Sequence, residues 1–219
     1  MDIFLQQLIN GLVLGSVYAL VALGYTMVYG ILELINFAHG EITMMGAMVA
    51  LAVIGALALA APGLPGVLVL GAGLAVAIPV CVALGLLIER VAYRPLRHAP
   101  RLAPLITAIG VSIILQNIAM LIWGKQYIPF PAILPQARHT VYGASITNVQ
   151  IAILLLATGI MLTLILVVRK TRLGRAMRAT AQSRQVASLM GVDVNRVIAA
   201  TFAIGSALAA VAGVMVSAY

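Results

Sequence analysis

Long apolar runs alternate with short polar or proline-containing breaks along the whole chain. A helix needs about 20 apolar residues to cross a hydrocarbon core of about 30 Å. Six runs reach that length: 8–31, 41–61, 65–88, 104–124, 149–168 and 197–218. Because the runs are continuous and do not alternate with a period of two, they favour helices over a transmembrane β-barrel. We therefore expect an all-α, polytopic transmembrane helical bundle of about six spans, forming a single domain over residues 1–219.

The composition supports this interpretation. Of the 219 residues, 63% are hydrophobic and only 8% are charged, whereas a soluble domain carries roughly a quarter charged residues. Too few polar side chains are present to cover a soluble core, so the chain is expected to be integral to a membrane. The single cysteine, Cys81, excludes a disulfide framework and a cysteine-based metal centre, and we expect no metal site.

The positive charge is concentrated in two loops. Loop 89–101 and loop 169–196 together hold 11 of the 13 Lys and Arg residues, and the formal net charge is +8. Lys and Arg in short loops stay on the cytoplasmic side of a membrane, so both loops are expected to face the cytoplasm, with the N-terminus outside. The charge therefore indicates orientation and contact with membrane lipid, and we expect no binding to nucleic acid.

Loop 169–196 also carries a pattern of its own. Its basic start is followed by a short amphipathic run, 183–190, in which Val186, Leu189 and Met190 recur at about helical spacing, and the run ends at Gly191. A long cytoplasmic loop with a short helix is typical of a permease that docks on a soluble motor domain. A helix lying on anionic lipid would show the same pattern, and the residues alone leave both interpretations open.

A polar segment, 33–41, separates the first two apolar runs and holds four polar side chains: Glu33, Asn36, His39 and Glu41. Ionisable groups at membrane depth are costly and usually functional. The segment is either a broken helix that lines a translocation path or a short cytoplasmic loop in water. The flanking glycines and the absence of a Pro or Gly turn signal within the segment favour the broken helix.

Two neutral polar residues, Gln116 and Asn117, lie near the middle of run 104–124. They could hydrogen-bond a passing zwitterion or a neighbouring helix. The candidate translocation path therefore comprises Asn36, His39, Glu41, Gln116 and Asn117. Outside segment 33–41 the predicted spans contain no Asp or Glu, which argues against a carrier driven by protons or sodium.

Small residues recur every four positions in two runs. Gly11 and Gly15 form a GxxxG motif in the first run, and Gly205, Ala209 and Gly213 form a similar stripe in the last. Such stripes let helix backbones approach closely. We expect packing within the chain, with contact between two permeases as the alternative.

Known catalytic signatures are missing from the sequence. There is no HExxH zinc pair, no Ser/His/Asp constellation in the spans and no glycine-rich phosphate loop with its lysine. The chain is therefore not expected to be an enzyme or to bind ATP.

Several stretches resemble known transporters. Gln185, Val186 and Ala187, followed by Gly191, are similar to the EAA-xxx-G loop of ABC importer permeases, with Gln185 in place of the glutamate. Residues 35–41 (INFAHGE), together with 10–30 and 190–214, resemble the branched-chain amino acid permease family over nearly the whole chain. Members of that family usually continue further, so the chain resembles a shortened permease.

The resemblance implies a multi-pass permease of the bacterial cytoplasmic (inner) membrane that imports leucine, isoleucine and valine. It further implies a periplasmic substrate-binding protein, a second homologous permease subunit and two cytoplasmic ATP-binding subunits, which hydrolyse the ATP, so that this chain needs no cofactor. The coupling segment would comprise Gln185, Val186, Ala187, Ser188, Leu189, Met190 and Gly191. Related permeases carry urea or short amides, and a channel or facilitator independent of ATP is a further alternative.

Overall fold

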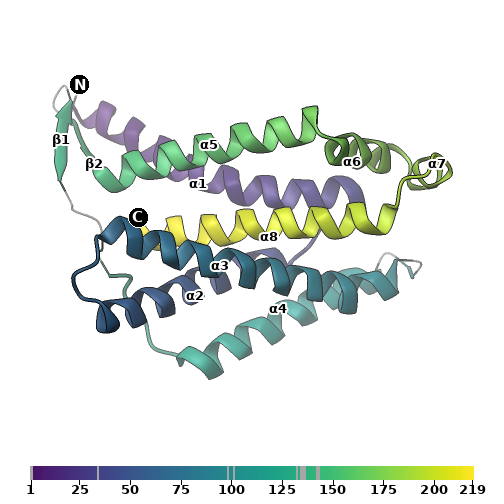
Figure 1. The fold of residues 1–219 in the computed structure, drawn as a ribbon, viewed down its shortest axis with the longest axis horizontal. Coiled ribbons are helices and arrows are strands. Elements are labelled where there is room, and N and C mark those ends of the chain that lie inside the picture. The colour runs from purple at the N-terminus through teal and green to yellow at the C-terminus, as the bar shows by residue number, and fades with distance from the viewer. Residues whose placement is uncertain are drawn as a thin grey trace.

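Six long helices form the bundle seen in Figure 1. The computed structural model describes residues 2–33, 35–97, 99–100, 102–131, 133, 137–141 and 144–219. Each of the six helices is long and apolar enough to cross a membrane, which confirms the predicted helical bundle. Their bounds are α1, Asp2–Leu32; α2, Ala38–Ala60; α3, Gly66–Ile88; α4, Leu102–Trp123; α5, Asn148–Lys170; and α8, Val194–Ala218.

The third span ends later than its apolar run. Beyond α3 the chain continues as a π-helical turn, Glu89–Tyr93, and a 3-10 turn, Arg94–Leu96. The predicted run 65–88 is therefore confirmed as α3, and the charged residues beyond it continue in other helical geometries. Pro95 is tolerated near the start of the 3-10 turn, where its missing N–H is not needed. Glu89 is consequently buried at the end of a span.

Helix α8 lies at the centre of the bundle, between α1 and α3 in Figure 1, and packs on α1, α2 and α3. Its small residues permit this, as predicted: a Cβ atom at Gly213 would collide with the backbone carbonyl of Thr43 in α2. At Gly11 and Gly15 the prediction of packing within the chain is wrong, since a Cβ atom there would meet no atom within 4 Å. The GxxxG motif of α1 instead lies on an exposed face of that helix.

The connection between α4 and α5 contains a β-hairpin that the sequence pattern did not predict. Strands β1, Arg138–Val141, and β2, Ala144–Thr147, pair antiparallel with Arg138 opposite Thr147. Gln6 of α1 binds the hairpin, because its amide donates to the carbonyl of Ser145 at 3.0 Å and accepts from the N–H of Ser145 at 2.8 Å. The hairpin lies at the same end of the bundle as both marked termini (Figure 1).

Loop 169–196 contains two helices, α6 (Arg172–Gln182) and α7 (Arg184–Leu189), where the sequence pattern predicts one. Each begins with a capping hydroxyl: the Gly174 N–H donates to Thr171 Oγ1 at 3.0 Å, and the Val186 N–H donates to Ser183 Oγ at 3.3 Å. The predicted short helix is confirmed as α7. The sequence pattern does not predict α6, because its arginines give the segment the composition of a basic loop.

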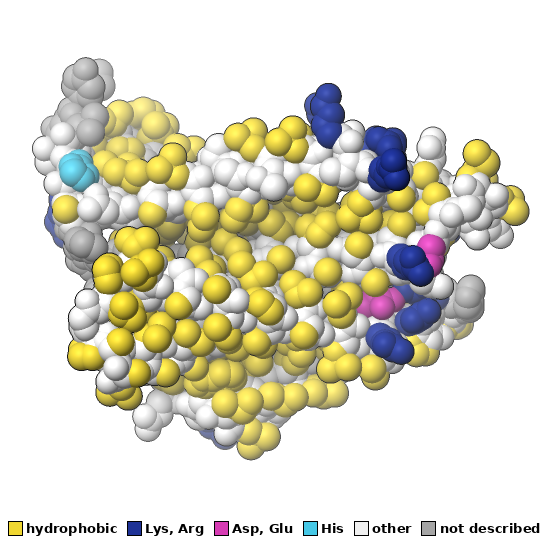
Figure 2. Space-filling model, viewed as in Figure 1, with side chains coloured by type: hydrophobic (Ala, Val, Ile, Leu, Met, Phe, Trp, Pro, Cys, Tyr) yellow, Lys and Arg dark blue, Asp and Glu magenta, His cyan; other side chains and the backbone are white. Residues whose placement is uncertain are grey.

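The bundle has one basic end. Lys and Arg side chains gather at the right of Figure 2, while the visible face over the helices is largely hydrophobic. The described parts of loops 89–101 and 169–196 both lie at this end, as predicted from their separation by two spans (Figure 1).

Candidate functional site

The polar segment 33–41 comprises the connection between α1 and α2 and the first turn of α2. Helix α1 ends at Leu32 and α2 begins at Ala38, and Figure 1 shows α2 starting short of the end where α1 stops. Glu33 has a φ of 58°, a left-handed conformation that is uncommon outside glycine. Asn36 is 3% exposed and His39 is 1% exposed. These two side chains therefore do not sit in a loop surrounded by water, although the segment joins two separate spans.

Asn36 holds the start of α2 in place. Its Oδ1 atom accepts a hydrogen bond from the Ala38 N–H at 3.1 Å and another from the Tyr93 hydroxyl at 2.9 Å. The first bond satisfies a backbone donor that the helix start would otherwise leave unpaired, and the second joins α2 to the π-helical turn after α3. The Asn36 carbonyl oxygen is thus fully engaged by the protein.

His39 joins α2 to α1. Its ring packs against the Tyr25 ring, with the centroids 4.5 Å apart, and occupies the space that a side chain at Gly24 would need. The Nε2 atom is buried and has no hydrogen-bond partner among the described residues. The structure therefore places His39 in helix packing.

Glu41 and Gln116, both predicted path residues, are brought into direct contact. Glu41 Oε1 accepts a hydrogen bond from Gln116 Nε2 at 2.7 Å and a second from Ser112 Oγ at 2.9 Å. Asn117 does not join them, because its side-chain amide donates to the carbonyl of Ile113 in its own helix at 2.8 Å. Sequence reasoning did not include Ser112 in the path, although it lies one helical turn from Gln116.

Helix α7 projects apolar side chains from the basic end. Val186 is 57% exposed, Leu189 86% and Met190 80%, whereas Ala187 is only 2% exposed. Gln185 and Ser188 are exposed as well. The helix therefore rests on Ala187 and presents its larger apolar side chains outward. Gly191 ends it with a φ of 82°, a conformation that glycine adopts without steric cost.

Arg184 positions α7 against α1. Its Nε and Nη2 atoms donate to the carbonyl oxygen of Ile31 at 3.1 Å and 2.7 Å. This carbonyl belongs to the last turn of α1, where backbone acceptors lack helical partners and cations are favoured. A displacement of α7 is thereby linked to the helix that precedes the connection at 33–37.

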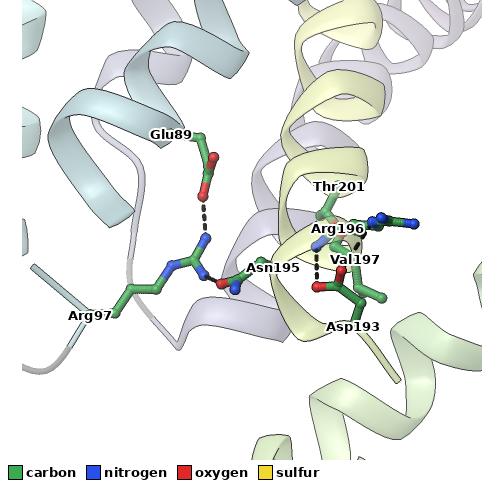
Figure 3. Close-up of polar contacts among 7 residues, drawn as sticks. All are labelled: Glu89, Arg97, Asp193, Asn195, Arg196, Val197 and Thr201. Atoms are coloured by element: carbon green, nitrogen blue, oxygen red, sulfur yellow. Dashed lines mark hydrogen bonds and ion pairs between the residues drawn. The ribbon is translucent and has the colours of Figure 1, made fainter. Parts of the chain in front are cut away.

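Arg97 connects the π-helical turn after α3 with α8, as Figure 3 shows. It donates through Nη2 to Glu89 Oε1 and through Nη1 to Asn195 Oδ1. Burial lowers the pKa of the Arg97 guanidinium, and the adjacent Glu89 carboxylate opposes that shift. Sequence reasoning missed this bridge. A carboxylate directly after an apolar run, with arginines following, was the available signal.

The start of α8 is capped by Asp193, whose Oδ1 accepts from the Arg196 N–H at 3.1 Å (Figure 3). Between α7 and α8 lies an open groove of about 680 Å³. It is lined by Arg97, Arg184, Gln185, Ser188, Leu189 and Asn195, among others. Residues from the bridge, from α7 and from α8 therefore meet at one surface of the basic end.

The described residues contain no group of three His, Cys, Asp or Glu that could hold a metal ion. Cys81 is buried in α3, where its thiol donates to the carbonyl of Ile42 at 3.6 Å.

Comparison with known proteins identifies the family. The sequence model described as "Branched-chain amino acid transport system / permease component" matches residues 7–219. The chain belongs to this permease family. It is 47% identical over 216 residues to the high-affinity branched-chain amino acid transport system permease protein LivH of Escherichia coli K12, covering 97% of this chain and 70% of that protein. It is 48% identical over 217 residues, with the same coverage, to the permease protein BraD of Pseudomonas aeruginosa.

No solved structure matches the chain. The family and the six apolar helices confirm the resemblance drawn from residues 35–41, 10–30 and 190–214. This permease is a multi-pass membrane protein of a transport system, and its relatives are transport components.

Proposed function

We propose that this permease is the transmembrane subunit of a binding-protein-dependent ABC importer that carries leucine, isoleucine and valine across the bacterial cytoplasmic membrane. The basic end faces the cytoplasm, because Lys and Arg in short loops are retained there. On that side two partner subunits bind and hydrolyse ATP. A second homologous permease completes the pore, and a periplasmic binding protein delivers the amino acid.

The observation that carries the proposal is α7. Its exposed Val186, Leu189 and Met190 offer an apolar contact on a loop that also resembles the coupling segment of ABC importers. Exposed apolar residues gathered on one short helix are typical of a contact with another protein. In this proposal the segment Gln185–Gly191 docks on the ATP-binding subunit.

Motion of α7 reaches the spans by two routes. Through Arg184 it acts on the last turn of α1, and through the short 190–193 connection it acts on α8 and on the bridge from Asn195 through Arg97 to Glu89. Closure of the ATP-binding subunits would therefore tilt α1, α3 and α8 together. Hydrogen bonds at both routes make this linkage stiffer than apolar contact alone.

The proposed translocation path runs along the exposed tyrosines of α1, the start of α2 and the middle of α4. Tyr18 and Tyr29 are exposed on α1, and the Tyr25 hydroxyl lies 3.5 Å from the position a Cβ atom would take at Gly40. Glu41 and Gln116 continue this face on α2 and α4. Exposing hydroxyl, amide and carboxylate groups to lipid is costly. We therefore expect this face to line a water-filled path or to contact the second permease.

Reconstitution tests the proposal. The complete importer, with both permeases, both ATP-binding subunits and the binding protein, is placed in proteoliposomes, and uptake of labelled leucine is measured with and without ATP. We expect uptake to require both ATP and the binding protein. Uptake without ATP would indicate a facilitator, and uptake of urea or short amides in preference to leucine would indicate a different cargo.

A further inference from the structure

Glu41 is a carboxylate within a membrane span that lacks a cationic partner in the described chain. Its two hydrogen-bond donors, Ser112 Oγ and Gln116 Nε2, are both uncharged. No Lys, Arg or His among the described residues forms an ion pair with it. An ionised carboxylate at membrane depth is costly unless water or a cation compensates it, so a compensating group must come from outside these residues.

Two features hold this carboxylate in one place without neutralising it. Ser112 and Gln116 lie one turn apart on α4 and donate to the same oxygen, Oε1. Glu41 also lies in the first turn of α2, where the helix dipole favours a negative charge. Fixed dipoles around an uncompensated charge form a preorganised site for an ion of opposite sign.

The site is accessible and has an apolar neighbour. Glu41 is partly exposed, and Gly40 and Gln116 are exposed. Phe37, one helical turn before Glu41, has helical dihedral angles and an exposed ring. Residues four positions apart share one side of a helix, so an aromatic surface lies beside the carboxylate.

We propose that Glu41 binds the α-ammonium group of the amino acid in passage, while Ser112 and Gln116 orient the carboxylate. The inference rests on the proposed function and assigns a role to one residue of its path. A branched-chain amino acid presents an ammonium group next to an apolar side chain, which matches a carboxylate next to Phe37. One ion pair supported by neutral donors binds weakly, and weak binding lets a cargo leave the path as well as enter it.

The first test removes the charge and keeps the shape. In the complete reconstituted importer, Glu41→Gln still allows hydrogen bonds with Ser112 and Gln116. We expect leucine uptake to fall roughly tenfold or more, while ATP hydrolysis stimulated by the binding protein persists. Thr163→Val is the matched control: it removes an exposed hydroxyl on α5 that only bonds its own helix and should leave uptake unchanged.

Moving the charge sharpens the test. The double variant Glu41→Gln/Gln116→Glu keeps one carboxylate and one amide in contact, and we expect it to recover most of the uptake lost in Glu41→Gln. Wild-type uptake in Glu41→Gln, or no recovery in the double variant, would overturn the inference. If Glu41→Gln lost both ATP hydrolysis and the second permease on purification, the inference would also be overturned, because the carboxylate would then pair with a cation of that subunit.

A chemical probe separates the two proposals. 3-Methylbutylamine carries an ammonium group and a branched chain, whereas 4-methylpentanoate carries a carboxylate instead. We expect the amine to inhibit leucine uptake by the wild type but not the residual uptake by Glu41→Gln. The acid should inhibit uptake by neither protein. Neither compound should change leucine binding to the isolated binding protein. Equal inhibition of both proteins by the amine would overturn the inference. Absence of ATP-dependent leucine uptake by the wild type would instead contradict the proposed function.

Discussion

Arg184, the first residue of α7, donates two hydrogen bonds to a single acceptor, the carbonyl oxygen of Ile31 in the last turn of α1. Because α7 is the proposed docking helix, this contact joins the docking helix directly to the end of α1. Arg184→Ala should therefore reduce leucine uptake per ATP hydrolysed by about fivefold or more, the lower end of typical coupling energies.

The matched control for that prediction is Arg175→Ala, which removes an exposed arginine of the neighbouring helix α6. Uptake and ATP hydrolysis are measured together in proteoliposomes for both variants. Equal ratios in the two variants would show that the Arg184 contact with Ile31 does not transmit motion.

Leu189→Asp should weaken association with the ATP-binding subunits without unfolding the permease. The side chain is exposed on α7, so its loss removes no internal contact, whereas a charge within an apolar interface costs about 2 kcal/mol, or roughly 30-fold in affinity. Co-purification and thermal unfolding are the two measurements. Tyr127→Asp, an exposed position after α4 at the opposite end, should retain the partners, and equal loss in both would contradict docking at α7.

Gly213→Ala should destabilise the bundle by about 1–3 kcal/mol, because the added methyl group would collide with the backbone carbonyl of Thr43, which cannot rotate away. Gly11→Ala and Gly15→Ala should cause no comparable loss, since nothing lies within 4 Å of a Cβ atom there. The free energy of unfolding in mixed detergent micelles compares the three variants. A loss at Gly11 equal to that at Gly213 would contradict the exposed position of the α1 motif.

Tyr93→Phe and Asn36→Ala should differ in stability. Tyr93→Phe removes one hydrogen bond, worth about 1 kcal/mol. Asn36→Ala also leaves the buried Ala38 N–H and the Tyr93 hydroxyl without a partner, which costs about 1–3 kcal/mol for each unsatisfied group. The double variant should be less destabilised than the sum of the two, because the pair shares a bond. Strict additivity in the unfolding free energies would show that the bond contributes nothing.

The spans and the basic end could be predicted because both depend on local information. Apolar length decides whether a segment can cross a membrane, and the loops that hold most of the arginines are separated by two spans. The end of α3 at Ile88 was predicted, whereas its continuation as a π-helical turn was not, because the charges of Glu89 and Arg90 give them the local pattern of a loop.

The candidate site was predicted only in part. Glu41 and Gln116 were selected singly as polar residues in apolar surroundings, yet their contact joins positions 75 residues apart, and no local pattern encodes such a pairing. The same limit applies to Asn36 and Tyr93. Whether a polar side chain faces a path, as Glu41 does in our proposal, or fastens a helix start, as Asn36 does, depends on the neighbouring helix.

The packing of His39 into the space beside Gly24 has an evolutionary consequence. The imidazole ring fills the volume that any larger side chain at position 24 would occupy, so neither residue can change size alone without disturbing the α1 and α2 contact. Substitutions at the two positions should therefore arise together among relatives, with a bulkier residue at 24 accompanied by a smaller one at 39.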